Sequence, residues 1–198
     1  MPLYKVYHSY PLTDEQRQTL ATAITNLHCE TFTTPSFFVH IRFIPHDARD
    51  GNYFMAGRPR LTNSNHIVGI VRTSPARPNS AFDALAAKIE SAWYEAVHSQ
   101  LGEGLEEKNA TDRKRLLLVM FTPMITIREG GMAIPEADQE DNWLTKQLLF
   151  IRQMSEEGLD DFTEMLREIQ EREDLKGLVS NWASCVTPVF CQSRVYAT

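Results

Sequence analysis

The sequence predicts a mixed α/β (α+β) fold: a double β-α-β unit whose four strands form one sheet with two helices on one face, followed by a helical C-terminal extension. Three observations predict it. Strand-like and helix-like segments follow one another as strand–helix–strand, twice, within residues 1–135. Both halves place a strand, a proline-containing loop and a helix of similar length in the same order. Residues 136–198 differ, because helical spacing of apolar residues prevails there.

The first half opens with an alternating segment. Leu3 to His8 alternates apolar and polar side chains and is rich in Val and Tyr, which predicts a half-buried strand. Thr13 followed by Gln16 has the capping-box pattern, and apolar residues at helical spacing then predict an amphipathic helix over residues 14–31. Phe37 to Ile44 predicts a second strand, which a proline closes.

The second half repeats this pattern after a polar segment. Residues 46–65 are rich in Gly, Asn and Arg, and we expect a short hairpin around Tyr53–Met55. His66 to Val71 predicts the third strand, and a second helix is expected from residue 79 or 80. The continuous apolar run Leu116 to Phe121 predicts a fully buried fourth strand.

The last third predicts two helices and a tail. Asn142 to Met154 and Asp160 to Leu175 have helical spacing and are separated near Gly158. Val179 to Val195 is moderately apolar and is expected to be extended. We interpret this extension as packing on the same domain or on a neighbouring subunit; a lid or a partner surface are the alternatives.

The predicted sheet has one face without helices. In a monomer that face would be apolar and uncovered, and large apolar patches are usually buried by other copies of the chain. We therefore expect a symmetric oligomer.

Composition argues against several kinds of partner. A net charge of −6 with no long basic run argues against nucleic acid as the main partner. No apolar span is long enough to cross a membrane, and residues 1–30 carry charge throughout, so we expect a cytoplasmic protein without a signal peptide. Cys29, Cys185 and Cys191 lack zinc-like spacing and are expected to be reduced, although Cys185 and Cys191 could pair.

The second residue is a candidate catalyst. Removal of Met1 would leave Pro2 as a secondary amine at the start of the first strand. An α-amino group titrates at about 7.7–8.0, so it can act as acid, base or nucleophile near neutral pH. The alternative interpretation is that Pro2 merely follows the start of the chain.

Four further residues lie close to predicted element ends, where sites gather in open α/β sheets. They are His28 near the end of the first helix, Arg72 and Arg77 after the third strand, and Glu129 after the fourth. Arginine binds carboxylates bidentately, and a glutamate can activate water or shuttle a proton. Taken singly, each is more commonly a packed or solvated residue. Together with an amine they suit the binding of a small carboxylate while protons move at adjacent carbons.

Four segments within residues 2–135 carry a family resemblance. Pro2 opens an alternating strand, and Ala23-Ile24-Thr25-Asn26-Leu27-His28 is a helical segment that ends in histidine. Gly51 to Gly57 is a glycine-flanked hairpin, and Ile67 to Arg72 is a strand that delivers an arginine. These features resemble the tautomerase superfamily, most closely its cis-3-chloroacrylic acid dehalogenase group, which includes fungal oxalocrotonate-tautomerase-like proteins.

The resemblance implies roles for the candidate residues. Pro2 would be the catalytic amine, which protonates C2 in dehalogenase-type members and acts as base and then acid in tautomerases. His28 and Arg72 would bind the substrate carboxylate. The second arginine of the family stands three residues after the first, where this chain has Pro75. Arg77 would take that role if the loop bends to suit.

The resemblance also contains a departure. Glu129, in Arg128-Glu129-Gly130-Gly131, resembles the water-activating glutamate, in a loop about two residues shorter. The tyrosine that assists this glutamate aligns with Met120, and a thioether cannot donate that hydrogen bond. This difference disfavours dehalogenation or hydration more than tautomerisation, which needs no activated water.

The resemblance thus leads to one functional hypothesis with two alternatives. Residues 1–135 would form a tautomerase-like domain that assembles as a homotrimer, as the resemblance implies. It would transfer protons on a small unsaturated or 2-keto carboxylic acid without metal or organic cofactor. Enol–keto tautomerisation is the expected reaction of this homotrimer. The alternatives are a cis-3-haloacrylate dehalogenase or hydratase of the same fold, and a non-catalytic oligomeric binding protein, which a retained Met1 would favour.

Overall fold

The computed structural model describes residues 2–98, 113–137 and 139–177. The chain divides into two compact units, residues 1–138 and residues 139–198. The first unit contains the sheet and all five predicted site residues, and the second contains helices.

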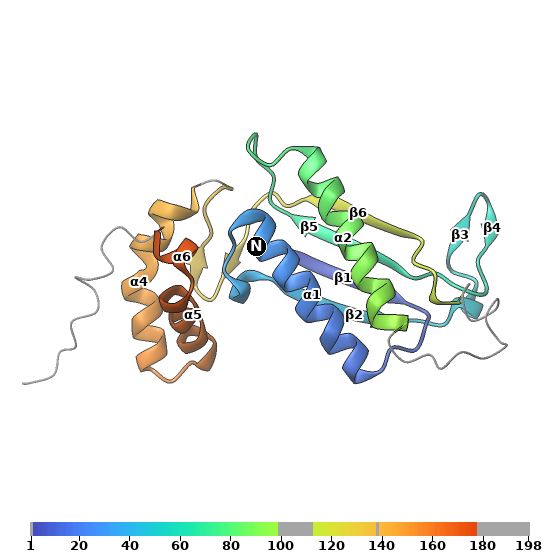
Figure 1. Ribbon diagram of the computed structural model, residues 1–198, viewed down its shortest axis with the longest axis horizontal. Coiled ribbons are helices and arrows are strands. Elements are labelled where there is room, and N and C mark those ends of the chain that lie inside the picture. The colour runs from blue at the N-terminus through green and yellow to red at the C-terminus, as the bar shows by residue number, and fades with distance from the viewer. Residues whose placement is uncertain (1, 99–112, 138, 178–198) are drawn as a thin grey trace, which may run out of the picture. The chain divides into compact units, whose positions relative to one another are not determined.

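The first unit is built on a four-stranded sheet in the order β2-β1-β5-β6 (Figure 1). β1 is parallel to β2, β5 is parallel to β6, and the two central strands β1 and β5 are antiparallel. A helix connects each parallel pair, so the double β-α-β arrangement predicted from the sequence is confirmed. The strands are β1 (Leu3–His8), β2 (His40–Pro45), β5 (His66–Val71) and β6 (Leu118–Pro123).

Both crossover helices, α1 (Asp14–Phe32) and α2 (Asn79–His98), cover the same face of this sheet (Figure 1). The capping box is present at the start of α1, where Thr13 and Gln16 exchange side-chain-to-backbone hydrogen bonds. The core between the sheet and the helices is formed by fully buried apolar side chains, among them Tyr4, Val6, Leu20, Ile24, Ile67, Leu85, Ile89 and Trp93.

Two strand predictions need correction. β2 begins at His40 rather than Phe37, because residues Ser36–Phe38 form a short 3-10 helix. β6 runs from Leu118 to Pro123 and is not fully buried, since Leu118 and Met120 are 38% and 47% exposed. β6 is an edge strand with helices on only one side, so an apolar run of this kind does not require burial on both faces.

Two small hairpins extend from the sheet. β3 (Phe54–Met55) pairs with β4 (Arg58–Pro59) at the hairpin position expected from the sequence. Ala56 and Gly57 between them both have positive φ, which is the backbone of a two-residue hairpin turn. β7 (Arg128–Glu129) pairs with β8 (Met132–Ala133), so Glu129 stands on a strand of a hairpin.

The sheet face without helices is less apolar than expected. Strand alternation places Leu3, Val68, Ile70, Leu118 and Met120 there, but also Lys5, Arg42, His40 and His66. The polar residues lie mainly on β1 and β2, whereas the exposed apolar ones lie on β6. The strongly exposed apolar side chains are thus found at one edge of the sheet, while half-buried apolar and polar residues share the rest of this face.

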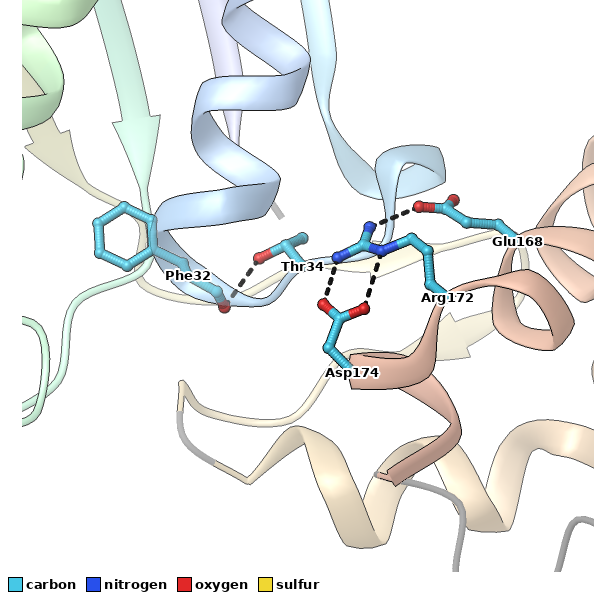
Figure 2. A network of polar contacts seen from close by, with 5 residues as sticks. All are labelled: Phe32, Thr34, Glu168, Arg172 and Asp174. Atoms are coloured by element: carbon cyan, nitrogen blue, oxygen red, sulfur yellow. Dashed lines mark hydrogen bonds and ion pairs between the residues drawn. The ribbon is translucent and has the colours of Figure 1, made fainter.

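The second unit consists of α4 (Glu140–Glu156), α5 (Asp160–Glu171) and α6 (Glu173–Gly177). The single helix predicted for residues 160–175 is wrong, because it is interrupted at Arg172, whose backbone is extended (φ −86°, ψ 117°). The Arg172 guanidinium lies 2.6 Å from Glu168 and 2.6 Å from Asp174, which joins the two helices (Figure 2). Apolar residues of α4, α5 and α6 form the buried interior of this unit: Leu144, Leu148, Ile151, Phe162, Met165, Ile169 and Leu175.

The cysteines, the predicted tail and the possibility of a membrane span are the remaining features that the sequence analysis considered. Cys29 is a free, buried thiol. The predicted tail and the other two cysteines lie outside the described residues. Within residues 2–98, 113–137 and 139–177, none of the helices combines the length and apolar character that a membrane span requires.

Candidate active site

The candidate site lies at the end of the sheet where β1 and β2 begin and where β5 and β6 finish. Leu3 pairs with His40 on one side and with Ile70 on the other, and Ile70 pairs with Thr122. The residues just before β1 and just after β5 therefore meet at one sheet end. This is the end opposite the β3–β4 hairpin (Figure 1).

Pro2 is buried at this end, immediately before β1. Its carbonyl oxygen accepts a hydrogen bond from the backbone N–H of His40, with an N···O distance of 3.1 Å. This bond continues the parallel β1–β2 ladder by one residue and holds the start of the chain against β2.

His28 lies in the last two turns of α1 and is only 3% exposed. Its Nδ1 is 2.8 Å from the Tyr4 hydroxyl. Burial lowers the pKa of His28 to about 3, and the positive charges of the amino terminus and of Arg77 act in the same direction. The imidazole is therefore neutral at physiological pH.

Tyr4 determines which nitrogen of this neutral imidazole carries the proton. Burial raises the pKa of the Tyr4 hydroxyl well above its ordinary value, so it remains protonated. Its buried hydrogen needs an acceptor, and the assignment that satisfies it has Tyr4 donating to His28 Nδ1. Nε2 then carries the proton of His28 and can donate to a bound anion.

Arg77 reaches the same region by a bend in the loop before α2. Its backbone N–H donates to the Ser74 carbonyl, with an N···O distance of 3.0 Å, which closes a turn. The guanidinium carbon lies 5.2 Å from the centre of the Phe32 ring, in cation–π geometry. The Phe32 ring is itself 5.0 Å from that of His28. The Arg77 guanidinium and the His28 ring thus both contact Phe32.

Phe32 is the last residue of α1, and the chain leaves the helix directly after it. Thr33 has a left-handed backbone (φ 48°), and the Thr34 hydroxyl donates to the Phe32 carbonyl at 3.4 Å (Figure 2). The ring of Phe32 also packs 4.9 Å from Phe82 of α2. These contacts fix the surface on which the Arg77 guanidinium rests.

Arg72 follows β5 directly and is 9% exposed. It stands at the sheet end where Pro2 precedes β1, since β1 and β5 are antiparallel. Pro75, which occupies the position of the family's second arginine, is exposed. The structure thus places both arginines near the start of β1, in different ways: Arg72 by strand register and Arg77 by the loop.

Glu129 comes to this end of the sheet on the β7–β8 hairpin. Its Oε1 is 2.6 Å from Nε2 of His40, and its other oxygen, Oε2, is buried with no hydrogen-bond partner among the described residues. Burial raises the pKa of the Glu129 carboxyl, whereas the hydrogen bond and charge of His40 and the charge of the amino terminus oppose that rise.

Strand order explains how Glu129 meets His40. β6 and β2 are at opposite edges of the sheet, and only residues 124–127 separate β6 from β7. This short segment must pass the ends of β5 and β1 to bring Glu129 to His40. Met120, on β6, is three strand spacings from β2, or roughly 14 Å. Within one chain, the position aligned with the assisting tyrosine is therefore remote from Glu129.

The amino terminus is what the two groups of residues share. Its positive charge lowers the pKa of His28 and also that of Glu129. The first group is His28 with Tyr4 and Arg77, and the second is Glu129 with His40. Pro2, the residue before β1, is at the same end of the sheet as both groups.

A pocket of about 620 Å³ opens beside the carboxyl ends of β5 and β6. It is lined by Val71, Thr73, Asn79, Phe82, Asp83, Ala86, Val119, Phe121, Thr122 and Pro123. Val71 and Thr73 flank Arg72 in the sequence, but none of the five predicted site residues lines the pocket. Within the described ranges, no group of three or more His, Cys, Asp or Glu side chains is placed to hold a metal ion.

Sequence reasoning did not find Tyr4 or His40. Tyr4 appeared only as an apolar position of the first strand, and the local pattern does not reveal that its hydroxyl meets a histidine 24 residues away. His40 fell inside a predicted strand that was assigned three residues too early. His40 is the first residue of β2, and β2 pairs with β1, the strand that follows Pro2. That position is the signal that would have identified His40.

The family match and the double β-α-β fold together make this chain a member of the tautomerase superfamily. Residues 1–147 match the family model described as "Putative oxalocrotonate tautomerase enzyme", and the chain belongs to that family. No curated protein matches the sequence.

A solved structure with a TM-score above 0.5 shows the same fold, and two others are less similar. A member of the cis-3-chloroacrylic acid dehalogenase family, N1, is 21% identical with a TM-score of 0.52, over 71% of this chain and 89% of that one. A fused 4-OT wild-type asymmetric trimer is 16% identical with a TM-score of 0.47, over 66% and 94%. Leishmania major MIF2 is 16% identical with a TM-score of 0.48, over 68% and 97%.

Proposed function

We propose that the protein is a cofactor-independent enol–keto tautomerase that uses Pro2, freed by removal of Met1, as its acid and base. The observation that carries this proposal is that Pro2 is buried at the end of the sheet and is hydrogen-bonded through its carbonyl to His40, whose side chain contacts Glu129. An amine at that place can take a proton from one carbon or oxygen of a bound acid and return it to another. An α-amino group titrates close enough to neutral pH to do both.

The substrate class follows from the groups around the amine. Arg72 and Arg77 supply permanent positive charge, and His28 supplies a neutral Nε2–H donor. These groups suit a carboxylate, with the Phe32 ring beside the guanidinium of Arg77 to exclude water. A small unsaturated or 2-keto carboxylic acid would bind its carboxylate here and present its adjacent carbons to Pro2.

A second candidate reaction is supported by Glu129. Hydration or dehalogenation of a 3-haloacrylate requires a base that activates water, and Glu129 Oε2 is buried without a partner among the described residues. Met120 in the same chain is too far away to assist Glu129. Glu129 still has a hydrogen-bonding neighbour, because His40 contacts it. Low activity of this kind alongside tautomerisation is part of the proposal.

The proposed assembly is a homotrimer. The exposed apolar residues of β6, Leu118 and Met120, lie on the sheet face that α1 and α2 leave uncovered, and a second copy of the chain could cover them. The rival from another class is a non-catalytic oligomer in which Met1 is retained and caps the amine.

The test is turnover of phenylenolpyruvate, followed by proton NMR, by wild type, Pro2→Ala and the control Pro11→Ala. Pro11 is an exposed proline before α1 and lies outside the site. We expect Pro2→Ala to lower kcat by about 10²–10⁴-fold, as for the loss of a general acid–base group, and Pro11→Ala to leave it unchanged. Intact mass establishes whether Met1 is absent. Retained Met1 in the native host, or a Pro2→Ala variant as active as wild type, would exclude the proposed mechanism.

A further inference from the structure

We propose that His40 is the positioning residue of Glu129: it holds Oε1 and thereby directs Oε2 at the water that adds to the substrate. This inference rests on the proposed function and concerns its second reaction. It assigns to His40 the part that the sequence comparison gave to a tyrosine absent from this chain.

His40 is hydrogen-bonded both to Pro2, the proposed acid, and to Glu129, the proposed base. Its backbone N–H donates to the carbonyl of Pro2, and its side-chain Nε2 is 2.6 Å from Glu129 Oε1. The amine-bearing residue and the carboxylate are thus linked through a single residue whose backbone is fixed in the β2 ladder. A displacement of His40 would change the distance between Pro2 and Glu129. His40 therefore positions these two groups relative to one another.

The two carboxylate oxygens of Glu129 differ in their hydrogen bonding. Oε1 is satisfied by His40, whereas Oε2 is buried and has no partner within the described parts of the chain. The Glu129 side chain is 13% exposed, compared with 52% for His40, so the carboxylate is enclosed while the imidazole faces outward. A buried carboxylate oxygen without a partner is costly, and a water or a substrate proton would satisfy it.

The chemistry assigns each proton a place. Oε2 accepts a proton from water as the water oxygen bonds to C3 of a 3-haloacrylate, and protonated Pro2 delivers its proton to C2. The 3-halo-3-hydroxypropanoate so formed expels halide as the C–X bond breaks and the hydroxyl proton is lost, which leaves an aldehyde. Solvent then removes the proton from Glu129 and returns one to Pro2. The sum is water in, and halide with one proton out.

His40 can do for Glu129 what Met120 cannot. An imidazole Nε2–H donates a strong hydrogen bond to a carboxylate, and a thioether has no hydrogen to donate. The bond fixes the plane of the carboxylate, so the free lone pairs of Oε2 keep one direction. Ketonisation of an enol needs no water, so it should depend on this contact much less than hydration does.

The experiment compares His40→Ala, His40→Gln, Glu129→Gln and the control Arg42→Ala. Arg42 lies on the same strand and the same sheet face as His40, two residues further on. Chloride release from cis-3-chloroacrylate and ketonisation of phenylenolpyruvate are measured for each. We expect His40→Ala and Glu129→Gln to lower kcat for chloride release at least tenfold with KM unchanged, and to lower kcat for ketonisation by a much smaller factor. His40→Gln, which retains an amide donor, should recover most of that loss.

Each other outcome decides against the inference or against the proposed function. A wild type that ketonises but releases no chloride would overturn the role of His40, as would equal losses in His40→Ala and Arg42→Ala. If wild type performs neither reaction, the proposed function fails. His40 is then judged by carbon-13 NMR titration of Glu129: removal of the His40 bond should raise the carboxyl pKa, and an unchanged pKa would refute the contact.

Discussion

At the scale of single residues, the most constrained group of the site is the imidazole of His28. It is buried by the aromatic rings of Tyr4 and Phe32, at 5.8 and 5.0 Å between ring centres. Burial makes its charged form unfavourable, so the folded state holds it neutral. A neutral donor binds a carboxylate without adding a buried charge when the site is empty. The same property makes stability depend on pH.

The sign of this dependence follows from linkage. The pKa of His28 is about 3 in the folded chain and about 6.5 when unfolded, so between these values the unfolded chain binds more protons. His28 therefore contributes stability that is complete above pH 6.5 and is lost as pH falls towards 3. We expect His28→Gln, which can still accept from Tyr4, to reduce the slope of unfolding free energy over this range by up to about 1.4 kcal/mol per pH unit.

Urea unfolding at pH 7, 5.5 and 4 measures this slope. The control is Asn26→Gln, an exposed change two residues earlier on α1. Parallel curves for wild type and His28→Gln would mean that His28 is not held neutral by the fold.

At the scale of elements, the central strand β5 makes room for the Tyr4 ring because it has a glycine, Gly69, beside it. Gly69 pairs with Tyr4 on β1 and with Phe121 on β6, and both rings lie over it. A Cβ at Gly69 would stand 2.7 Å from the Phe121 ring and 3.1 Å from that of Tyr4. The glycine is therefore required by close packing, and its effect reaches His28 through the Tyr4 hydroxyl.

We expect Gly69→Ala to destabilise the protein by about 1–3 kcal/mol, because the two rings must move within a packed core. Thermal and urea unfolding measure the loss. Gly177→Ala is the control, since nothing lies within 4 Å of the position a Cβ would take there. If the tautomerase is active, the variant should also bind substrate more weakly, since Tyr4 no longer holds His28 in place. Stability equal to that of wild type would contradict the packing argument.

At the scale of the whole molecule, the open sheet face determines how copies of the chain could meet. Its β1 and β2 portion carries Lys5, Arg42 and His40, and its β6 edge carries exposed Leu118 and Met120. The exposed apolar side chains of this face are thus at its β6 edge, which favours a contact between copies through β6. Met120, remote from Glu129 in its own chain, would then lie at a subunit boundary.

We expect Met120→Lys to shift the sedimentation of the protein from trimer to monomer at micromolar concentration, because a charge at this contact would be buried without a partner. Glu90→Lys is the control, as an exposed charge change on α2. A wild type that sediments as a monomer would refute the trimer, and an unchanged trimer in Met120→Lys would place the contact elsewhere.

Much of the architecture could be predicted because it is written in local patterns. Alternation identified β1, and the capping box placed the start of α1 at Asp14. Two of the three segments that needed correction lacked a local signal. The apolar residues Phe37 and Phe38 resemble a strand although they lie in a 3-10 turn, and Arg172 ends α5 through ion pairs that no helical periodicity reveals.

The sequence alone determined the order of the elements, the double β-α-β unit and the candidate residues Pro2, His28, Arg72, Arg77 and Glu129, because periodicity and short motifs act over a few residues. Only the tertiary structure decided what these residues touch. The His40–Glu129 contact spans 89 positions, and the Tyr4–His28 contact spans 24. Such pairings depend on strand order and register, which bring distant side chains to one sheet end through the packing of the entire unit. The partner of each catalytic candidate, and with it each protonation state, is therefore a property of the fold.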